Sequence, residues 1–173
     1  YSPCPLSFIG HGVQAAKTPS GTGALEEKGR RGSRIMFEQI LVPLDGSSLA
    51  ECVLPHVMAL ATPSGATLAL LRVLEQEEPD AGAPTDPIGW QLAQAEAQAY
   101  LQEVAQRVKA ESIEAQTVTI PGLPAERVVS FAREHDVDLI VLSSHGQSGL
   151  SGWNVSSVVQ KIILRAPSSV MIV

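Results

Sequence analysis

Residues 40–47 read Ile-Leu-Val-Pro-Leu-Asp-Gly-Ser. The three aliphatic residues predict a buried strand, and the Pro, Asp and Gly that follow are turn formers. Residues 48–51, Ser-Leu-Ala-Glu, then have the spacing of a capping box, which predicts that a helix starts at Ser48. A buried strand that passes through a tight turn into a helix is the opening of a β-α-β unit, so this stretch favours an α/β fold.

The same alternation continues to the last residue. Pro55 is expected to bend the first helix, which should end at residues 63–65, Pro-Ser-Gly. Apolar residues at helical spacing from Trp90 to Val108 predict a long second helix after a polar loop at 75–89. Further strands are predicted at 67–73, 117–120, 139–142 and 170–173, and further helices at 124–134 and around 155–166.

Strands that are apolar at nearly every position, and that are joined by helices, predict a parallel sheet covered on both faces. Right-handed crossovers then give a doubly wound α/β domain. Ligands bind to such sheets at the carboxyl ends of the strands, where the strand order reverses. Two loops should lie at that edge, residues 42–47 and residues 143–149, the latter reading Ser-Ser-His-Gly-Gln-Ser-Gly.

Composition excludes several classes of protein. Of the 173 residues 45% are hydrophobic and 17% charged, which argues against a disordered chain. The longest aliphatic runs fall far short of the roughly 20 residues that cross a bilayer, so no membrane association is expected. Cys4 and Cys52 have no cysteine or histidine cluster around them, so a disulfide scaffold or zinc site is not indicated and a reducing, cytoplasmic compartment is expected.

The charge is unevenly distributed along the chain. Residues 1–35 carry +3 and are rich in Gly, Pro and Ser, which predicts a flexible, disordered leader ahead of a domain at 36–173. The total of −6 therefore leaves −9 on residues 36–173. A domain this acidic is not expected to bind nucleic acid, because a phosphate backbone needs an excess of Lys and Arg.

Three segments carry a resemblance to a known family. They are ILVPLDGS at 40–47, PAERV at 124–128, and DLIVLSSHGQSGLSGW at 138–153 with SSVVQKIILRAPSSVMIV at 156–173. Together they make residues 36–173 resemble the universal stress protein family. The resemblance implies a five-stranded parallel sheet of order 3-2-1-4-5, a homodimer, and an ATP site in the nucleotide-binding members.

The resemblance also implies which residues would hold the nucleotide. Asp45 would meet adenine, and Pro43 and Val73 would line the pocket of the base or ribose. The family's phosphate motif, G-x2-G-x9-G-[S/T], falls on Ser143, Gly146, Ser156 and Ser157. Ser144 would join them at the phosphates, and Mg²⁺ would offset the phosphate charge.

Two of the motif's glycines are serine here, which leaves two functions open. The first is an ATP-binding, stress-response regulatory dimer, and the second is a dimeric interaction module of the same fold that no longer binds nucleotide. Glycine permits positive φ and close approach of backbone N–H groups to phosphate oxygens, whereas the small serine blocks less than a branched residue and can donate from its hydroxyl. Asp45 has a second interpretation as well, as a turn residue that bonds to its own backbone.

Other residues support no catalytic arrangement. His145 has no nucleophile or carboxylate partner in sequence, and no lysine follows the glycine loop as it would in a Walker-type NTPase, so at most slow ATP hydrolysis is expected. Trp153 is predicted to pack beside a helix start, and Cys52 to be a small buried hydrophobe. The strand at 170–173 is expected to pair with a second copy, because it would otherwise leave an open sheet edge.

Overall fold

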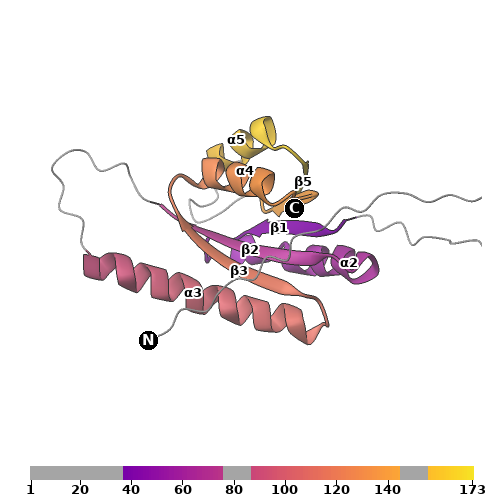
Figure 1. Ribbon diagram of the computed structural model, residues 1–173, viewed down its shortest axis with the longest axis horizontal. Coiled ribbons are helices and arrows are strands. Elements are labelled where there is room, and N and C mark those ends of the chain that lie inside the picture. The colour runs from indigo at the N-terminus through magenta and orange to yellow at the C-terminus, as the bar shows by residue number, and fades with distance from the viewer. Residues whose placement is uncertain (1–36, 76–86, 145–155) are drawn as a thin grey trace, which may run out of the picture. The chain divides into compact units, whose positions relative to one another are not determined.

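The computed structural model of the chain describes residues 37–75, 87–144 and 156–173. They form a five-stranded parallel sheet of order β3-β2-β1-β4-β5 (Figure 1), which confirms the predicted doubly wound architecture and strand order. The strands are β1 (Gln39–Pro43), β2 (Thr67–Leu74), β3 (Ala115–Pro121), β4 (Leu139–Leu142) and β5 (Ser169–Ile172). The order reverses between β1 and β4, so the carboxyl ends of these two strands mark the switch point.

Helices cover both faces of the sheet (Figure 1). They are α1 (Ser48–Glu51), α2 (Leu54–Ser64), α3 (Pro87–Ala110), α4 (Pro124–Glu134) and α5 (Ser157–Arg165). Helices α2 and α3 share one apolar core with the side chains on one face of the strands, and α4 and α5 share a second core with the opposite face. Successive residues of a strand point to opposite faces, so Ile40 enters the first core and Leu41 the second.

The turn after β1 differs from the sequence prediction. Ser47, not Ser48, is the N-cap of α1, and its Oγ accepts from the amide of Ala50 at 3.1 Å. The helix starts at Ser48 as predicted, but the capping box at Ser48 is wrong, because Ser48 is the first helical residue and Ser47 is the cap. Pro55 interrupts the helix as expected: α1 ends at Glu51, and α2 begins at Leu54 with the proline in its first turn, where the missing N–H costs nothing.

The remaining boundaries agree closely with the pattern. Helix α4 and strand β4 have the predicted bounds, and Gly65 (φ +68°) ends α2 in the left-handed conformation typical of a helix C-cap. Helix α3 starts at Pro87, earlier than the predicted loop end at 89, because proline is favoured in a first helical turn. No helix within the described ranges is both long and apolar enough to span a bilayer.

Cys52 is not the buried hydrophobe that its neighbours suggested. It is exposed, and its Sγ lies 3.8 Å from the Oγ of Ser143. The reason is local: the chain leaves α1 at Cys52 before α2 begins, so the helical periodicity that places Val53 and Leu54 in the core does not extend back to this residue.

Candidate functional site

A cavity of about 650 Å³ opens at the carboxyl ends of β1, β2 and β4. One wall is apolar and comes from the starts of α4 and α5 and the end of β2; it includes Val73, Pro124, Val128, Val159 and Ile162. The polar part of the lining comes from the loop after β1, the end of β2, and the two ends of the segment between β4 and α5. The cavity thus lies at the switch point of the sheet, where the fold predicts a ligand.

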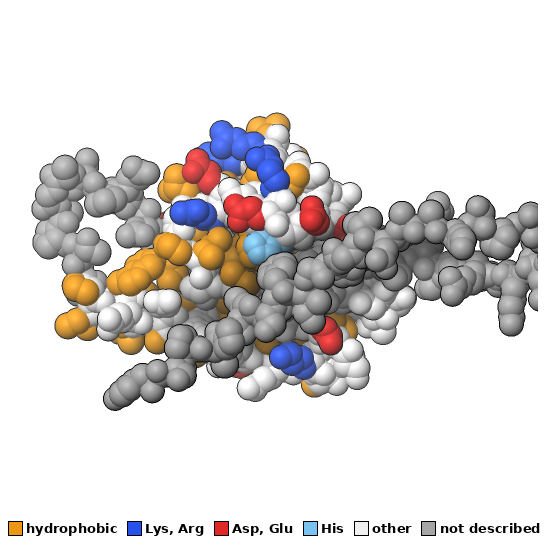
Figure 2. Space-filling view, viewed as in Figure 1, with side chains coloured by type: hydrophobic (Ala, Val, Ile, Leu, Met, Phe, Trp, Pro, Cys, Tyr) orange, Lys and Arg blue, Asp and Glu red, His pale blue; other side chains and the backbone are white. Residues whose placement is uncertain are grey.

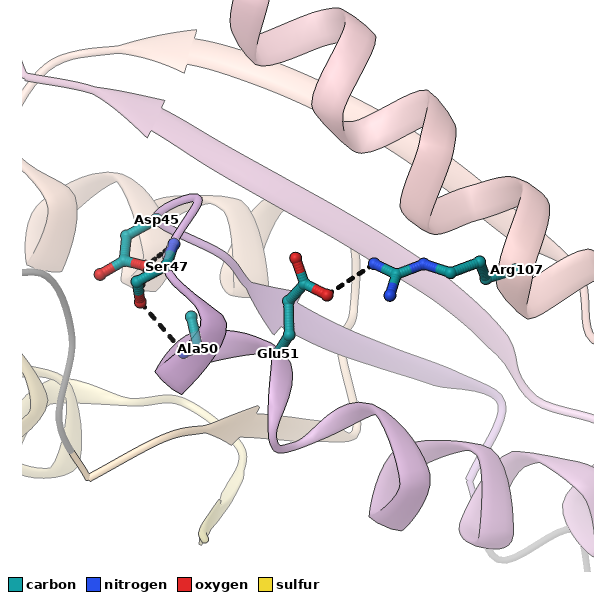
Figure 3. Close-up of polar contacts among 5 residues, drawn as sticks. All are labelled: Asp45, Ser47, Ala50, Glu51 and Arg107. Atoms are coloured by element: carbon teal, nitrogen blue, oxygen red, sulfur yellow. Dashed lines mark hydrogen bonds and ion pairs between the residues drawn. The ribbon is translucent and has the colours of Figure 1, made fainter.

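Asp45 occupies the turn at the end of β1, and its carboxylate is held in place (Figure 3). Its Oδ1 accepts from the backbone amide of Ser47 at 2.9 Å and from the Ser47 hydroxyl at 2.6 Å. This is the turn that the alternative interpretation predicted, yet Asp45 also lines the cavity. The two interpretations are compatible, because the turn fixes a carboxylate at the cavity wall.

Serines gather at the end of β4 and at the start of α5. Ser143, Ser156 and Ser157 line the cavity. The amide of Ser156 donates to the carbonyl of Ser144 at 3.3 Å, which brings the two ends of the segment after β4 together. Ser156 is the N-cap of α5 through a 3.3 Å bond from the amide of Val159, so the positive end of the helix dipole lies at the cavity wall.

Most of the predicted site residues come together in this cavity. Those that line it are Pro43, Asp45, Val73, Ser143, Ser156 and Ser157. Ser144 is not among the described lining residues; its amide donates to the carbonyl of Val173 at 2.9 Å. Gly146, His145 and Trp153 lie outside the described residues.

The sequence analysis overlooked two charged residues of the lining, Arg72 and Glu75. Both follow from the pattern in hindsight, because Arg72 is a charged residue inside the otherwise apolar strand β2 and Glu75 is the first residue after it. A cation in a strand that is buried on both faces is unusual unless it has a partner or a function.

Arg72 has an aromatic neighbour across the first core. Its guanidinium carbon lies 5.6 Å from the centre of the Tyr100 ring, on α3. Burial, and next the nearby carboxylate of Glu51, raise the pKa of Tyr100 above its ordinary value, so the phenol stays neutral at physiological pH. Glu51 itself is bound by Arg107, whose Nη2 lies 2.6 Å from a carboxylate oxygen (Figure 3).

The surface over α4 and α5 carries charges of both signs (Figure 2). Exposed Arg133 and Lys161 alternate with exposed Glu134, and Arg165 lies 4.0 Å from Glu126. Among the residues that the structure describes on these two helices, acidic and basic side chains are therefore interspersed. A continuous basic surface of the kind that tracks a phosphate backbone needs one sign of charge.

The strand order and the position of the cavity place the chain among the doubly wound α/β proteins whose ligands bind at a switch point. The model of the universal stress protein family matches residues 36–173, and the chain belongs to this family.

Individual relatives agree with that membership. The universal stress protein Sll1654 of Synechocystis is 32% identical over 143 residues, covering 82% of this chain and 88% of the relative. The solved structure of MJ0577 of Methanocaldococcus jannaschii superposes with a TM-score of 0.73 at 26% identity, covering 80% of this chain and 96% of that one. A universal stress protein crystallised in complex with cAMP gives a TM-score of 0.60 at 25% identity, with 79% and 96% covered.

Proposed function

We propose that this universal stress protein binds an adenine nucleotide, ATP with Mg²⁺, in the cavity at the switch point. The observation that carries the proposal is the combination, in one cavity of about 650 Å³, of an apolar wall with the serine-lined start of α5. Pockets for small ligands typically have volumes of roughly 300 to 1,000 Å³ and are mostly apolar with a few placed polar groups. The relative that was crystallised with cAMP supports the choice of an adenine nucleotide.

In this proposal the base and the phosphates occupy opposite sides of the cavity. Asp45 accepts from the base, and Pro43 and Val73 line the pocket of the base or ribose. The phosphates lie against the start of α5, where backbone N–H groups and the helix dipole favour an anion.

Serine hydroxyls would supply further donors to the phosphates. Ser143, Ser156 and Ser157 are at the cavity wall, and Ser144 and Gly146 belong to the same segment. No group of three metal-binding side chains occurs in the part of the chain that the structure describes. Mg²⁺ would therefore be held through phosphate oxygens and water, which suits an ion that dehydrates reluctantly.

Ser156→Gly is expected to tighten ATP binding by up to about tenfold, or 1.4 kcal/mol. Glycine removes the Cβ that limits the approach of phosphate to the backbone, and as an N-cap it costs α5 only a few tenths of a kcal/mol. Calorimetry in excess Mg²⁺ measures the affinity. Ser156→Ala is the matched control, because it removes the hydroxyl but keeps the Cβ, and it should not tighten binding.

Nucleotide binding itself is tested on the purified wild-type chain. Mass spectrometry of the denatured protein identifies any nucleotide carried through purification, and calorimetry with ATP gives the affinity. Binding by the wild type supports the proposal. If the wild type does not bind, and a variant with glycine at both 143 and 156 does, the chain is instead an interaction module that has lost its nucleotide.

We further propose that the chain forms a homodimer through β5. This strand pairs with β4 on one side only, so its other edge is open among the described residues. Val173 uses both of its backbone groups toward β4, donating to Leu142 and accepting from Ser144. The backbone groups of the preceding residue, Ile172, must therefore point away from β4, toward a second copy. Its side chain is 40% exposed, which leaves apolar surface at this edge.

Ile172→Pro is expected to convert the dimer into a monomer. Proline removes an outward N–H and cannot join a new ladder, but it removes no hydrogen bond to β4. Light scattering at micromolar concentration should give the dimer mass for the wild type and for Ile172→Val, and the monomer mass for Ile172→Pro. A wild-type monomer, or a dimeric Ile172→Pro variant, would exclude this interface.

A further inference from the structure

Arg72 lines the cavity and has two guanidinium nitrogens without a hydrogen-bond partner among the described residues. Its Nε and Nη1 atoms are buried, and no described residue accepts a hydrogen bond from either of them. An arginine is always protonated, so the group holds a full positive charge in a partly buried position. Burying donors without acceptors is unfavourable, which is why native structures rarely retain such groups without a reason.

The Arg72 side chain lies between a glycine and an aromatic ring. On one side lies Gly46 (φ +84°), where a Cβ would meet Nη1, so a larger residue there would displace the guanidinium. On another side the neutral ring of Tyr100 lies 5.6 Å from the guanidinium carbon. One of the acidic residues of this region, Glu51, is engaged by Arg107. The Arg72 guanidinium lies against Gly46, the residue that follows Asp45, at the ends of β1 and β2.

Arg72 is also the donor that the base side of the cavity otherwise lacks. On the β1 and β2 side, the described lining consists of apolar side chains, the carboxyl groups of Asp45 and Glu75, and Arg72. Carboxylates accept hydrogen bonds, and aliphatic side chains neither donate nor accept them. Among these side chains Arg72 is therefore the one that donates. The serine hydroxyls that could also donate come from other elements, namely from Ser143 at the end of β4 and from the start of α5.

A purine nucleoside needs both kinds of partner. Its amino group is a donor, whereas its ring nitrogens and ribose oxygens are acceptors. The Asp45 carboxylate can accept from the amino group. A ring nitrogen or ribose oxygen of the same nucleoside requires an N–H group of the protein as its donor. Arg72 and Asp45 therefore form a donor and acceptor pair at the ends of β2 and β1.

We propose that Arg72 is a specificity-determining residue that donates a hydrogen bond to an acceptor atom in the nucleoside half of the ligand, beside Asp45. The inference rests on the proposed function and deepens it, because it assigns a residue to the recognition of the nucleoside rather than of the phosphates. The expected acceptor is a purine ring nitrogen or a ribose oxygen.

The test measures affinity and stability together in Arg72→Met, which keeps the length of the side chain and removes its donors. Affinity for Mg-ATP and for adenosine should fall by the same factor, at least about tenfold, because a hydrogen bond from a charged donor is worth roughly 1.5 to 3 kcal/mol. The melting temperature of the ligand-free protein should stay the same or rise, because two buried donors without acceptors have been removed. Arg127→Met, which changes an exposed arginine outside the described lining, is the matched control and should alter neither affinity.

Other outcomes separate the possible failures. If Arg72→Met binds ATP and adenosine as the wild type does, or melts well below it, Arg72 is structural and the inference is wrong. If ATP affinity falls but adenosine affinity does not, the contact is with phosphate and the inference is also wrong. If the wild type binds neither compound, the proposed function itself has failed. If Arg72→Met does not fold, Arg72→Lys replaces it in the test, because lysine retains a shorter donor. Arg72→Lys must then lower the affinities for Mg-ATP and for adenosine by the same factor.

Two analogues distinguish the acceptors in the same titrations. With 2′-deoxyadenosine, an unchanged effect of Arg72→Met points to the base, and a lost effect points to the ribose. With 7-deazaadenosine, a lost effect identifies the ring nitrogen at position 7. If Arg72→Met lowers the affinity for adenosine and for both analogues by the same factor, the contact is with another atom of the nucleoside, which the proposal also covers.

Discussion

Ser157→Asp is expected to abolish ATP binding while leaving the fold intact or slightly more stable. Ser157 is the first residue of α5 and lies at the cavity wall, so a carboxylate there would face the phosphates of the proposed ligand. Two like charges about 4 Å apart repel by roughly 4 kcal/mol at an effective dielectric constant of 20, enough to weaken binding more than a hundredfold. In the free protein the same carboxylate stabilises the first turn of a helix by about 0.3 to 1 kcal/mol.

Calorimetry with Mg-ATP and a thermal melt of the free protein measure the two effects separately. Ser157→Asn is the matched control, since it has the size of aspartate without its charge, and it should lose far less affinity. Loss of binding with an unchanged or higher melting temperature would support phosphates at the start of α5. If Ser157→Asp binds ATP as tightly as the wild type, the phosphates do not lie there.

Leu70→Ala is expected to cause the largest loss of stability of any variant considered. Leu70 is fully buried in β2, which pairs with both β1 and β3, and its side chain lies in the core under α2 and α3. Truncating a buried leucine to alanine costs about 2 to 5 kcal/mol, because transfer free energy is lost and a cavity remains. For a domain of this size that corresponds to a fall in melting temperature of about 10 °C or more.

Leu92→Ala is the matched control for this change. Leu92 lies on α3 and is 59% exposed, so the same truncation should change the free energy of unfolding by less than about 0.5 kcal/mol. Urea unfolding of the three proteins gives the comparison directly. Equal losses at the two positions would mean that the core does not lie where the structure places it.

The sequence was sufficient for those elements whose signal is local. Helix α4 shows a clear apolar face, with Ala125, Val128 and Ala132 buried as predicted, and β4 is an unbroken aliphatic run between polar residues. Both have the predicted bounds. The strand order came from the resemblance of three segments to one family, because a strand's hydrophobicity says that it is buried but not which strand lies beside it.

Local signals were weaker where two adjacent residues could serve the same purpose. Ser47 and Ser48 can both cap a helix, and the choice of Ser47 depends on the bonds it makes with Asp45 and Ala50 in the folded turn. Cys52 was predicted to be buried because its neighbours are apolar, but the break between α1 and α2 turned it outward. In each case a shift of one residue in the backbone changed the role of the side chain.

The sequence by itself determined the fold class, most of the core, and which loops lie at the ligand-binding edge, because hydrophobic periodicity and turn residues act over a few neighbouring positions. Only the tertiary structure decided which side chains share the cavity. Arg72 is held by Gly46 and Tyr100, which lie on elements far apart in the chain, and its unsatisfied N–H groups become evident only when burial and partners are known. A cation in a strand is a local fact, but whether its buried nitrogens find an acceptor among the described residues depends on how distant elements pack.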